Sequence, residues 1–195
     1  MLTDNEKKVL RLLAVAFDKD YSINNIAKEC GLSPNGALKI LKKFKEEGIF
    51  KAKKIANIIS YRLDFENEKT DSILELALTS KIEGRVKYRS EDLKELKDII
   101  KSCILFGSYI SLKKEPADLD VLFVLDKANF KEYKKRLAGI KDIIPVKIQD
   151  ILQTEEDLKK NILKKDPVVL DILRKGIVLW GQKTIAKVIK SVYQR

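Results

Sequence analysis

The chain has 195 residues, of which 45% are hydrophobic and 35% are charged, a balance that predicts one large or two small folded domains and excludes a disordered chain. It contains no histidine, which excludes histidine-dependent zinc sites, histidine-based catalytic triads and histidine general bases. Its 40 lysines and arginines exceed its 29 aspartates and glutamates, which gives a net charge of +11 and favours a polyanionic partner. The surface ion pairs of a thermophilic protein would explain the same lysine-rich composition.

Membrane and secretion signals are not expected. No stretch reaches the roughly 18 apolar residues of a membrane span. The N-terminal residues 1–6 do not form the basic and apolar regions of a secretory signal peptide. We therefore expect a cytoplasmic protein without membrane contact. The two cysteines, Cys30 and Cys103, lie far apart and are expected to be buried thiols.

The first part of the chain predicts three helices. Apolar residues are dense between Asn5 and Phe17, which is typical of a helix that packs on two neighbours. Ser22 is placed to cap a short second helix that ends at Gly31. Ser33 and Pro34 are placed at the cap and the first position of a third helix.

A β-hairpin is expected after the third helix. Residues 49–53 and 58–63 alternate between apolar and polar side chains and flank a connection at residues 54–57. Three helices followed by a hairpin form a winged helix-turn-helix. The residue rhythm of this segment resembles that of the MarR- and ArsR-like winged-helix families of prokaryotic regulators, and the matching residues are Ser22, Ile26, Ala27, Gly31, Leu32, Ser33, Leu38 and Leu41. The resemblance implies a DNA-binding domain over residues 1–65.

The resemblance also implies which residues contact double-stranded DNA. In such domains the third helix enters the major groove and the hairpin lies on the phosphates. The polar residues available for this are Ser33, Asn35, Lys39, Lys42 and Lys43 on the helix and Lys51, Lys53 and Lys54 on the hairpin. Only Asn35 and Ser33 carry base-reading chemistry, so the lysines predict phosphate contacts more than sequence selectivity. A solvated basic face on a winged helix that binds protein is the alternative.

The remainder of the chain predicts an α/β domain. Residues 67–83 are typical of a linker or dimerisation helix ending at Gly84, and Ser90 is placed to cap a helix that reaches Ile100. Apolar strands then alternate with helical patterns. The expected strands cover 103–106, 120–125 and 144–151, and the expected helices cover 130–140 and 155–163. We therefore divide the chain into domain 1–65, a helical linker 66–89 and domain 90–195.

Two short motifs stand at the ends of neighbouring strands in this second domain. One apolar strand leads into Gly107-Ser108, and the next strand opens with Asp118 and Asp120. This order is similar to that of the nucleotidyltransferase superfamily that includes DNA polymerase beta, and especially to its minimal prokaryotic members. Residues 176–181 are similar to the glycine-bounded ending of those domains. The resemblance implies an archaeal-type α/β (α+β) protein with a C-terminal nucleotidyltransferase-fold domain and a mixed β-sheet.

The chemistry of these residues fits a metal-bound nucleotide. Asp118 and Asp120 are two positions apart on a strand and so face the same side, where they can hold one or two Mg²⁺ ions against the phosphates of an NTP. Gly107 lets the backbone approach the triphosphate, and Ser108 can donate to phosphate oxygens. An exposed aspartate pair without a ligand is the other interpretation. It does not explain why two carboxylates open so apolar a strand.

The loop between the two motifs departs from the family pattern. Residues 110–112 replace the small, basic and glycine positions of the family, so Lys113 or Lys114 would have to supply the missing cation. Ala117 stands where the family usually has serine before the first aspartate. We retain Lys113 as the candidate nucleotide-binding cation.

The third metal-binding carboxylate of the family is the most serious departure. Asp150 is the candidate, but strand alternation places it on the same face as Ile148 and puts Lys147 and Gln149 on the other. If Ile148 faces the core, Asp150 reaches the metal only through a strand irregularity. Because this carboxylate is the usual candidate for the general base, its absence would leave nucleotide binding with poor transfer.

Two functions follow from the sequence. In the first, a DNA-binding protein carries a domain that binds Mg²⁺-NTP and transfers a nucleoside monophosphate to an acceptor. In the second, the protein is a transcriptional regulator whose nucleotidyltransferase domain has lost turnover and acts as a nucleotide sensor or a dimerisation unit, so that a second copy of the chain becomes a partner. The position of the third carboxylate discriminates between them.

Overall fold

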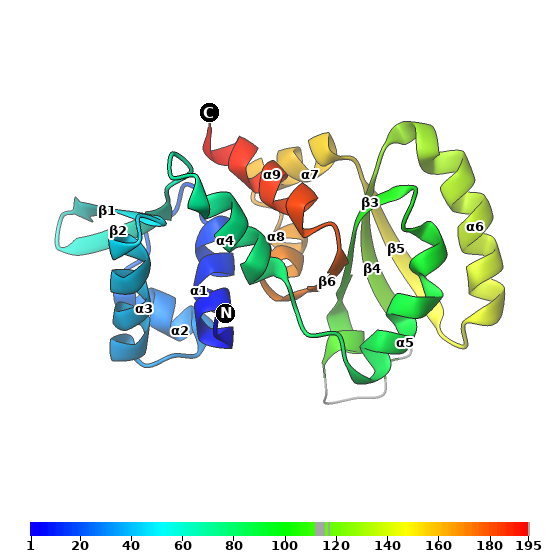
Figure 1. The fold of residues 1–195 in the computed structure, drawn as a ribbon, viewed down its shortest axis with the longest axis horizontal. Coiled ribbons are helices and arrows are strands. Elements are labelled where there is room, and N and C mark those ends of the chain that lie inside the picture. Colours follow the sequence, from blue (N-terminus) through cyan, green and yellow to red (C-terminus); the bar gives the residue numbers. More distant parts are fainter. Residues whose placement is uncertain (112–115, 117, 195) are drawn as a thin grey trace. The chain divides into compact units, whose positions relative to one another are not determined.

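A computed structural model describes residues 1–111, 116 and 118–194 of the chain (Figure 1). The chain forms two compact units, one made of Met1–Leu78 with Ile189–Arg195 and the other of Thr79–Val188. The first unit therefore combines segments from both ends of the sequence.

The first unit begins with three helices and a hairpin, which are α1 (Asp4–Ala14), α2 (Ile23–Cys30), α3 (Pro34–Glu46), β1 (Phe50–Ile55) and β2 (Ile58–Leu63). The predicted ends of α2 and the predicted start of α3 are confirmed, whereas α1 ends at Ala14, three residues before the predicted Phe17. The hydroxyls of Ser22 and Ser33 accept hydrogen bonds from the N–H groups of Asn25 and Gly36, at 3.2 and 3.1 Å. Gly31 ends α2 in the left-handed conformation, with a φ of 65°. These elements form the predicted winged helix-turn-helix.

The hairpin is tighter than predicted. Its strands are antiparallel and remain paired as far as Ile55 and Ile58, so the connection is only Ala56-Asn57. A two-residue turn needs a left-handed backbone, and Ala56 supplies it with a φ of 48°. The hairpin packs against α3 through an edge-to-face contact between Phe44 and Phe50, whose ring centroids are 5.4 Å apart.

The C-terminal helix completes this unit. α4 (Lys69–Leu78) packs on α1, and the end of α9 (Gln182–Tyr193) adds the aromatic ring of Tyr193. The Tyr193 hydroxyl donates a 2.5 Å hydrogen bond to the carbonyl of Leu13, and its ring meets Phe65 edge-to-face at 5.0 Å. Lys190 forms a 2.5 Å ion pair with Asp71 on α4. The sequence pattern did not predict these contacts.

The second unit contains a mixed sheet, as the resemblance implied, and this sheet has four strands instead of the three that the sequence pattern indicated. Its strands are β3 (Ile100–Phe106), β4 (Asp118–Leu125), β5 (Lys147–Gln153) and β6 (Ile177–Trp180), in the spatial order β5-β4-β3-β6. β3 runs antiparallel to β4 and β6, whereas β4 and β5 are parallel. The helices are α5 (Gly84–Asp92), α6 (Phe130–Ile143), α7 (Glu155–Leu163), α8 (Pro167–Lys175) and the first part of α9, with short 3-10 turns η1 (Lys94–Leu96), η2 (Gly107–Ile110) and η3 (Lys127–Asn129).

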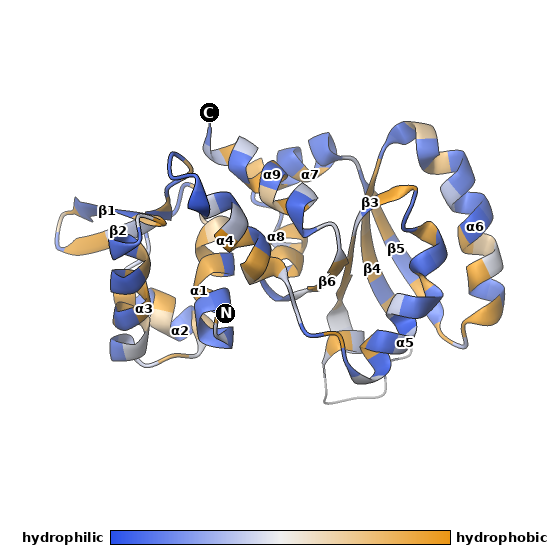
Figure 2. Ribbon diagram, in the orientation of Figure 1, coloured by the Kyte–Doolittle hydropathy of each residue, from blue (hydrophilic) through white to orange (hydrophobic). Residues whose placement is uncertain are grey.

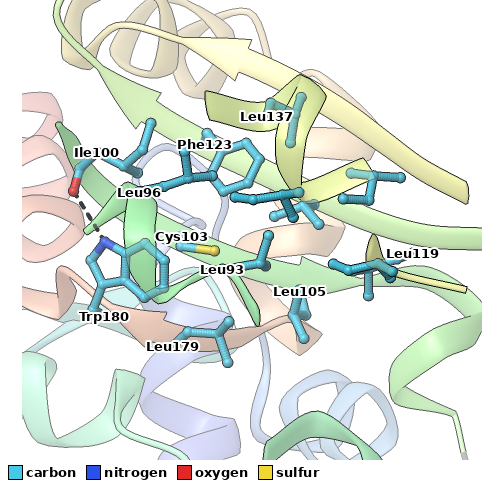
Figure 3. Packing of buried hydrophobic residues seen from close by; sticks show 14 of the residues in the cluster. Leu93, Leu96, Ile100, Cys103, Leu105, Leu119, Phe123, Leu137, Leu179 and Trp180 are labelled. Atoms are coloured by element: carbon cyan, nitrogen blue, oxygen red, sulfur yellow. Dashed lines mark hydrogen bonds between the residues drawn. The ribbon is translucent and has the colours of Figure 1, made fainter. Parts of the chain in front are cut away.

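Both faces of β4 are buried, which explains its uninterrupted apolar sequence. Leu119 and Phe123 belong to the core shared with α6, where Phe123 meets Tyr133 edge-to-face at 5.4 Å. Figure 3 shows this packing, with the indole N–H of Trp180 donating a 3.0 Å hydrogen bond to the carbonyl of Ile100. Leu122 and Val124 lie on the opposite face of the strand and are also completely buried. The hydropathy colouring of Figure 2 shows β3 and β4 as hydrophobic strands and α6 with a mixed surface.

Two helix predictions are wrong in their boundaries. α4 stops at Leu78, and Gly84 begins α5 instead of ending the preceding helix. Ser90 lies inside α5, and no helix continues to Ile100, which opens β3. The three-residue spacing of the buried Leu93 and Leu96 misled the prediction because it suits the 3-10 turn that forms there as well as an α-helix.

Cys30 and Cys103 are buried free thiols, as predicted. Complete burial raises the pKa of Cys103 far above its ordinary value, so this thiol is unreactive at neutral pH. Within the described ranges, no helix is both long enough and apolar enough to cross a membrane.

Candidate functional site

The pairing of β3 with β4 brings the two sequence motifs of the second unit together. Phe106 lies directly opposite Asp120 in the antiparallel register, so Gly107-Ser108 adjoins the start of β4. Asp118 and Asp120 are both half-buried and share one face of the strand because they are two positions apart. The structure therefore places Gly107, Ser108, Asp118 and Asp120 at one corner of the sheet.

Asp120 lies so close to Gly107 that a side chain at position 107 would collide with the Asp120 carboxylate. Gly107 has a φ of 68°, and a β-carbon built on it would lie 3.0 Å from Cγ of Asp120 and even closer to Oδ2. The backbone N–H of Ser108 donates a hydrogen bond to the same carboxylate. The glycine and the turn after it thus fix the position of the Asp120 side chain.

The electrostatics of this corner favour a bound cation. Partial burial and the negative charge of Asp118 raise the pKa of Asp120, and the hydrogen bond from Ser108 offsets only part of this effect. A cation beside the two carboxylates would oppose this effect on Asp120. The exposed hydroxyl of Ser108 adds a donor beside them.

Gln149 lies opposite Asp120 on the neighbouring strand β5, and its side chain reaches Asp118. Its side-chain amide donates a 2.7 Å hydrogen bond to Oδ2 of Asp118. The parallel register pairs Asp118 with Lys147 and Asp120 with Gln149, and both partners are exposed. The site face of β5 therefore presents an amide and an ammonium group, as strand alternation predicted.

Asp150 lies on the opposite face of β5. It accepts hydrogen bonds from the Tyr133 hydroxyl at 2.9 Å and from Nζ of Lys141 at 3.3 Å, both on α6. The register between β4 and β5 runs without a bulge from Asp118 to Val124. The structure therefore does not bring Asp150 together with Asp118 and Asp120, because the strand irregularity that this would need is absent. The described residues contain no group of three or more acidic or cysteine side chains that could hold a metal ion.

The structure describes the loop between the two motifs only in part. Lys113, Lys114 and Ala117 lie outside the described residues. Tyr109 is buried in the core, with the guanidinium of Arg85 5.2 Å from its ring centroid, so its role is packing.

The predicted DNA-contacting residues all lie on the surface of the first unit. They are exposed at the N-cap of α3 (Ser33), on α3 (Asn35, Lys39, Lys42 and Lys43) and on β1 (Lys51, Lys53 and Lys54). Ser33 also caps α3 through its hydroxyl, so only part of its hydrogen-bonding capacity is available to a base.

Two of these lysines already form ion pairs within the unit. Lys43 contacts Glu6 at 2.7 Å, and Lys51 contacts Asp64 and Glu66 at 3.0 and 2.5 Å. The hydrogen bonds to Glu66 and Asp64 raise the pKa of Lys51. The sequence alone did not separate these two from Lys39, Lys42, Lys53 and Lys54, none of which forms a salt bridge to another described residue.

Comparison with known proteins supports the DNA-binding assignment of the first unit. Residues 2–51 match a family model described as winged helix-turn-helix DNA-binding, and this match spans α1 to α3 and reaches the start of β1. No curated protein and no solved structure matches the chain.

Proposed function

We propose that this protein, which carries a winged helix-turn-helix DNA-binding module, is a regulator whose second unit binds a metal-chelated nucleotide without turning it over efficiently. The nucleotide part rests on one observation: Gly107 lies against Asp120, and Asp118 lies beside Asp120 on the same face of β4. On the neighbouring strand, Gln149 contacts Asp118. A carboxylate pair whose position is fixed by a glycine turn is suited to binding a metal-chelated nucleotide. The amide of Gln149 cannot accept a proton from an attacking hydroxyl.

The DNA-binding part of the proposal rests on α3 and the hairpin. Lys39, Lys42, Lys53 and Lys54 are exposed and offer ammonium groups to phosphates. Asn35 is the exposed residue of α3 with bidentate base-reading chemistry. We therefore expect binding to double-stranded DNA that is dominated by phosphate contacts and weakens steeply with salt.

The two aspartates suit Mg²⁺ only when phosphate oxygens complete its coordination. Mg²⁺ is commonly held by one or two carboxylates together with substrate phosphates. Asp118 and Asp120 would hold the ion, and the Ser108 hydroxyl would donate to a phosphate oxygen. The ion would supply positive charge that neutralises the phosphate oxygens. Since no third carboxylate lies on this face among the described residues, we expect Mg²⁺ alone to bind weakly and Mg²⁺ with nucleotide to bind cooperatively.

Nucleotidyl transfer is the second candidate function. The paired motifs Gly107-Ser108 and Asp118/Asp120 favour it, because their order along the chain and their contact in the sheet suit a metal-bound triphosphate. It requires a proton acceptor for the attacking hydroxyl in addition to the carboxylates that hold the metal.

A calorimetric titration of the full chain with ATP or CTP, with and without Mg²⁺, tests the proposal. The wild type is expected to bind nucleotide only with Mg²⁺, and the Asp118→Asn/Asp120→Asn double variant is expected to bind neither form while keeping its circular dichroism spectrum. Equal affinities of the two proteins would rule out the site. Incubation with α-labelled nucleotide and candidate DNA or protein acceptors separates the two functions, because rapid label transfer would establish the enzyme and overturn the binding role.

A further inference from the structure

The first unit contains a cavity of about 620 Å³ beside the hairpin. This volume falls within the roughly 300–1,000 Å³ of typical small-molecule sites. Its walls come from three places: the hairpin, the segment after α1 with Phe17 and Asp20, and the end of α9 with Val192 and Tyr193. All of these segments belong to the same compact unit.

Strand alternation gives the hairpin two different faces. Lys51 pairs with Arg62 and Lys53 pairs with Ser60, so these four side chains lie on the face that lines the cavity. The opposite face carries Phe50 and Tyr61, which are buried in the core of the unit. Lys54, the neighbour of Lys53 in sequence, therefore points away from the cavity.

Most charges around the cavity are already paired. Asp20 accepts a 2.7 Å hydrogen bond from the Ser60 hydroxyl and a 3.1 Å bond from Arg62, and these contacts lower its pKa, so Asp20 neutralises Arg62. Lys51 is held by Asp64 and Glu66.

Lys53 is different because it forms no salt bridge to another described residue. It faces a cavity whose other walls include the apolar side chains of Phe17, Ile55 and Val192. The cavity thus combines apolar wall residues with one ammonium group that forms no salt bridge to another described residue and is attracted by Asp20 only at longer range.

We propose that this cavity binds a small organic anion with an apolar, ring-sized body, its acidic group lying at Lys53. The apolar walls supply contact with the body of the ligand, and the ammonium group selects an acid over a neutral molecule of the same shape. A bound anion would also compete with DNA phosphates for Lys53, which makes the ligand an antagonist of DNA binding. This last consequence rests on the proposed DNA contact of the hairpin.

A pair of fluorescent probes tests the site on the full chain. 8-Anilinonaphthalene-1-sulfonate carries an acidic group, and N-phenyl-1-naphthylamine has the same apolar body without it. We expect the sulfonate to bind saturably and about tenfold more tightly than the neutral probe, as one charged hydrogen bond would produce. Absence of saturable sulfonate binding, or equal affinities for the two probes, would overturn the proposal.

Matched variants locate the site. Lys53→Gln is expected to remove the preference for the sulfonate, whereas Lys54→Gln, with the same change of charge on the other face, is expected to keep it. Ile55→Trp fills the cavity and is expected to abolish binding of both probes, and Ile59→Trp, on the other face of the same hairpin, is expected to have no effect. Equal effects within either pair would show that the probe binds elsewhere and would refute the cavity assignment.

The link to DNA is measured separately. Saturating sulfonate probe is expected to weaken binding of a labelled duplex to the wild type and to leave the Lys53→Gln variant unchanged. A protein that binds the probe at Lys53 but does not bind DNA would contradict the proposed function while the cavity assignment stands. A protein that binds DNA equally well with and without the probe would contradict the antagonism.

Discussion

The carboxylate of Asp120 occupies the space in which a side chain on residue 107 would begin. Gly107 is in the left-handed conformation, with a φ of 68°, and a β-carbon there would come 3.0 Å from Cγ of Asp120 and closer to its Oδ2. Substitution therefore meets both an unfavourable backbone conformation and a steric clash. This relationship makes Gly107 a sensitive test of whether the corner of the sheet is a binding site.

Gly107→Ala is expected to displace Asp120 and destroy Mg²⁺-nucleotide binding, and to lower the free energy of unfolding by about 1–3 kcal/mol. Calorimetry with Mg²⁺-ATP and thermal denaturation measure the two effects. Gly139→Ala is the matched control, because Gly139 lies in α6 with nothing within 4 Å of an added β-carbon. It should stabilise the protein by about 0.5–1 kcal/mol and leave nucleotide affinity unchanged. Unaltered nucleotide binding by Gly107→Ala would mean that this corner does not position the ligand.

Asp120→Asn is expected to stabilise the metal-free protein at neutral pH. Folding raises the pKa of Asp120, so the folded state binds its proton more tightly than the unfolded state does. Stability contributed by this group is present below the unfolded pKa and is lost as the pH rises through the folded pKa. The advantage of the variant should therefore disappear below about pH 4, where the unfolded carboxyl is also protonated. Denaturant unfolding at pH 7 and pH 3 checks this, and a variant less stable than the wild type at pH 7 would contradict it.

The sequence predicted the winged helix well because its signals are local. Ser22, Gly31 and Ser33 determine helix ends through their own backbone and capping chemistry. The alternation in β5 also indicated that Gln149 faces the aspartates if Ile148 faces the core. The sequence could not decide whether a strand irregularity brings Asp150, the candidate third ligand, to the same face, and the structure shows that it does not. In contrast, the contact of Tyr193 with Leu13 joins residues at opposite ends of the chain, and a local sequence pattern cannot predict such a contact. The cavity beside Lys53 depends on that same long-range contact.

The two adjacent lysines of α3 are expected to differ in their effects. Lys43 forms a salt bridge with Glu6. Burial alone would raise the pKa of Glu6, but the hydrogen bonds that Glu6 accepts from Lys43 and Thr3 lower this pKa overall. Lys42 is exposed without such a pair. Lys42→Ala should therefore reduce the salt dependence of DNA binding by about one unit of slope. Lys43→Ala should reduce it less but lower the free energy of unfolding by about 1 kcal/mol. Anisotropy titrations at several salt concentrations measure the slopes, and equal slopes for both variants would contradict the distinction.

Tyr193→Phe is expected to loosen the winged-helix unit selectively. It removes the hydroxyl that donates to Leu13 and keeps the ring against Phe65, so the expected loss is about 1 kcal/mol. Hydrogen exchange measured by mass spectrometry should show faster exchange in α1 and β2 and no change in β3 to β5. Trp180, the single tryptophan of the chain, lies in the second unit, and its fluorescence transition should stay in place. Faster exchange throughout both units would show that Tyr193 supports more than the first.

Gln149→Glu separates a binding site from a latent catalytic one. The amide of Gln149 already contacts Asp118, so the variant places a third carboxylate beside the pair. Without metal, repulsion among three carboxylates should lower stability, and Mg²⁺ should restore it because the ion then has three oxygen donors from the protein. We expect tighter binding of Mg²⁺ alone and measurable nucleotidyl transfer where the wild type shows little.

Asp150→Asn is the matched control, because it changes a carboxylate on the other face of β5, where Asp150 contacts Tyr133 and Lys141. This variant should alter neither metal affinity nor transfer. Loss of nucleotide binding in Asp150→Asn would overturn the assignment of the site face, and wild-type behaviour of Gln149→Glu would show that the aspartate pair does not hold the ion.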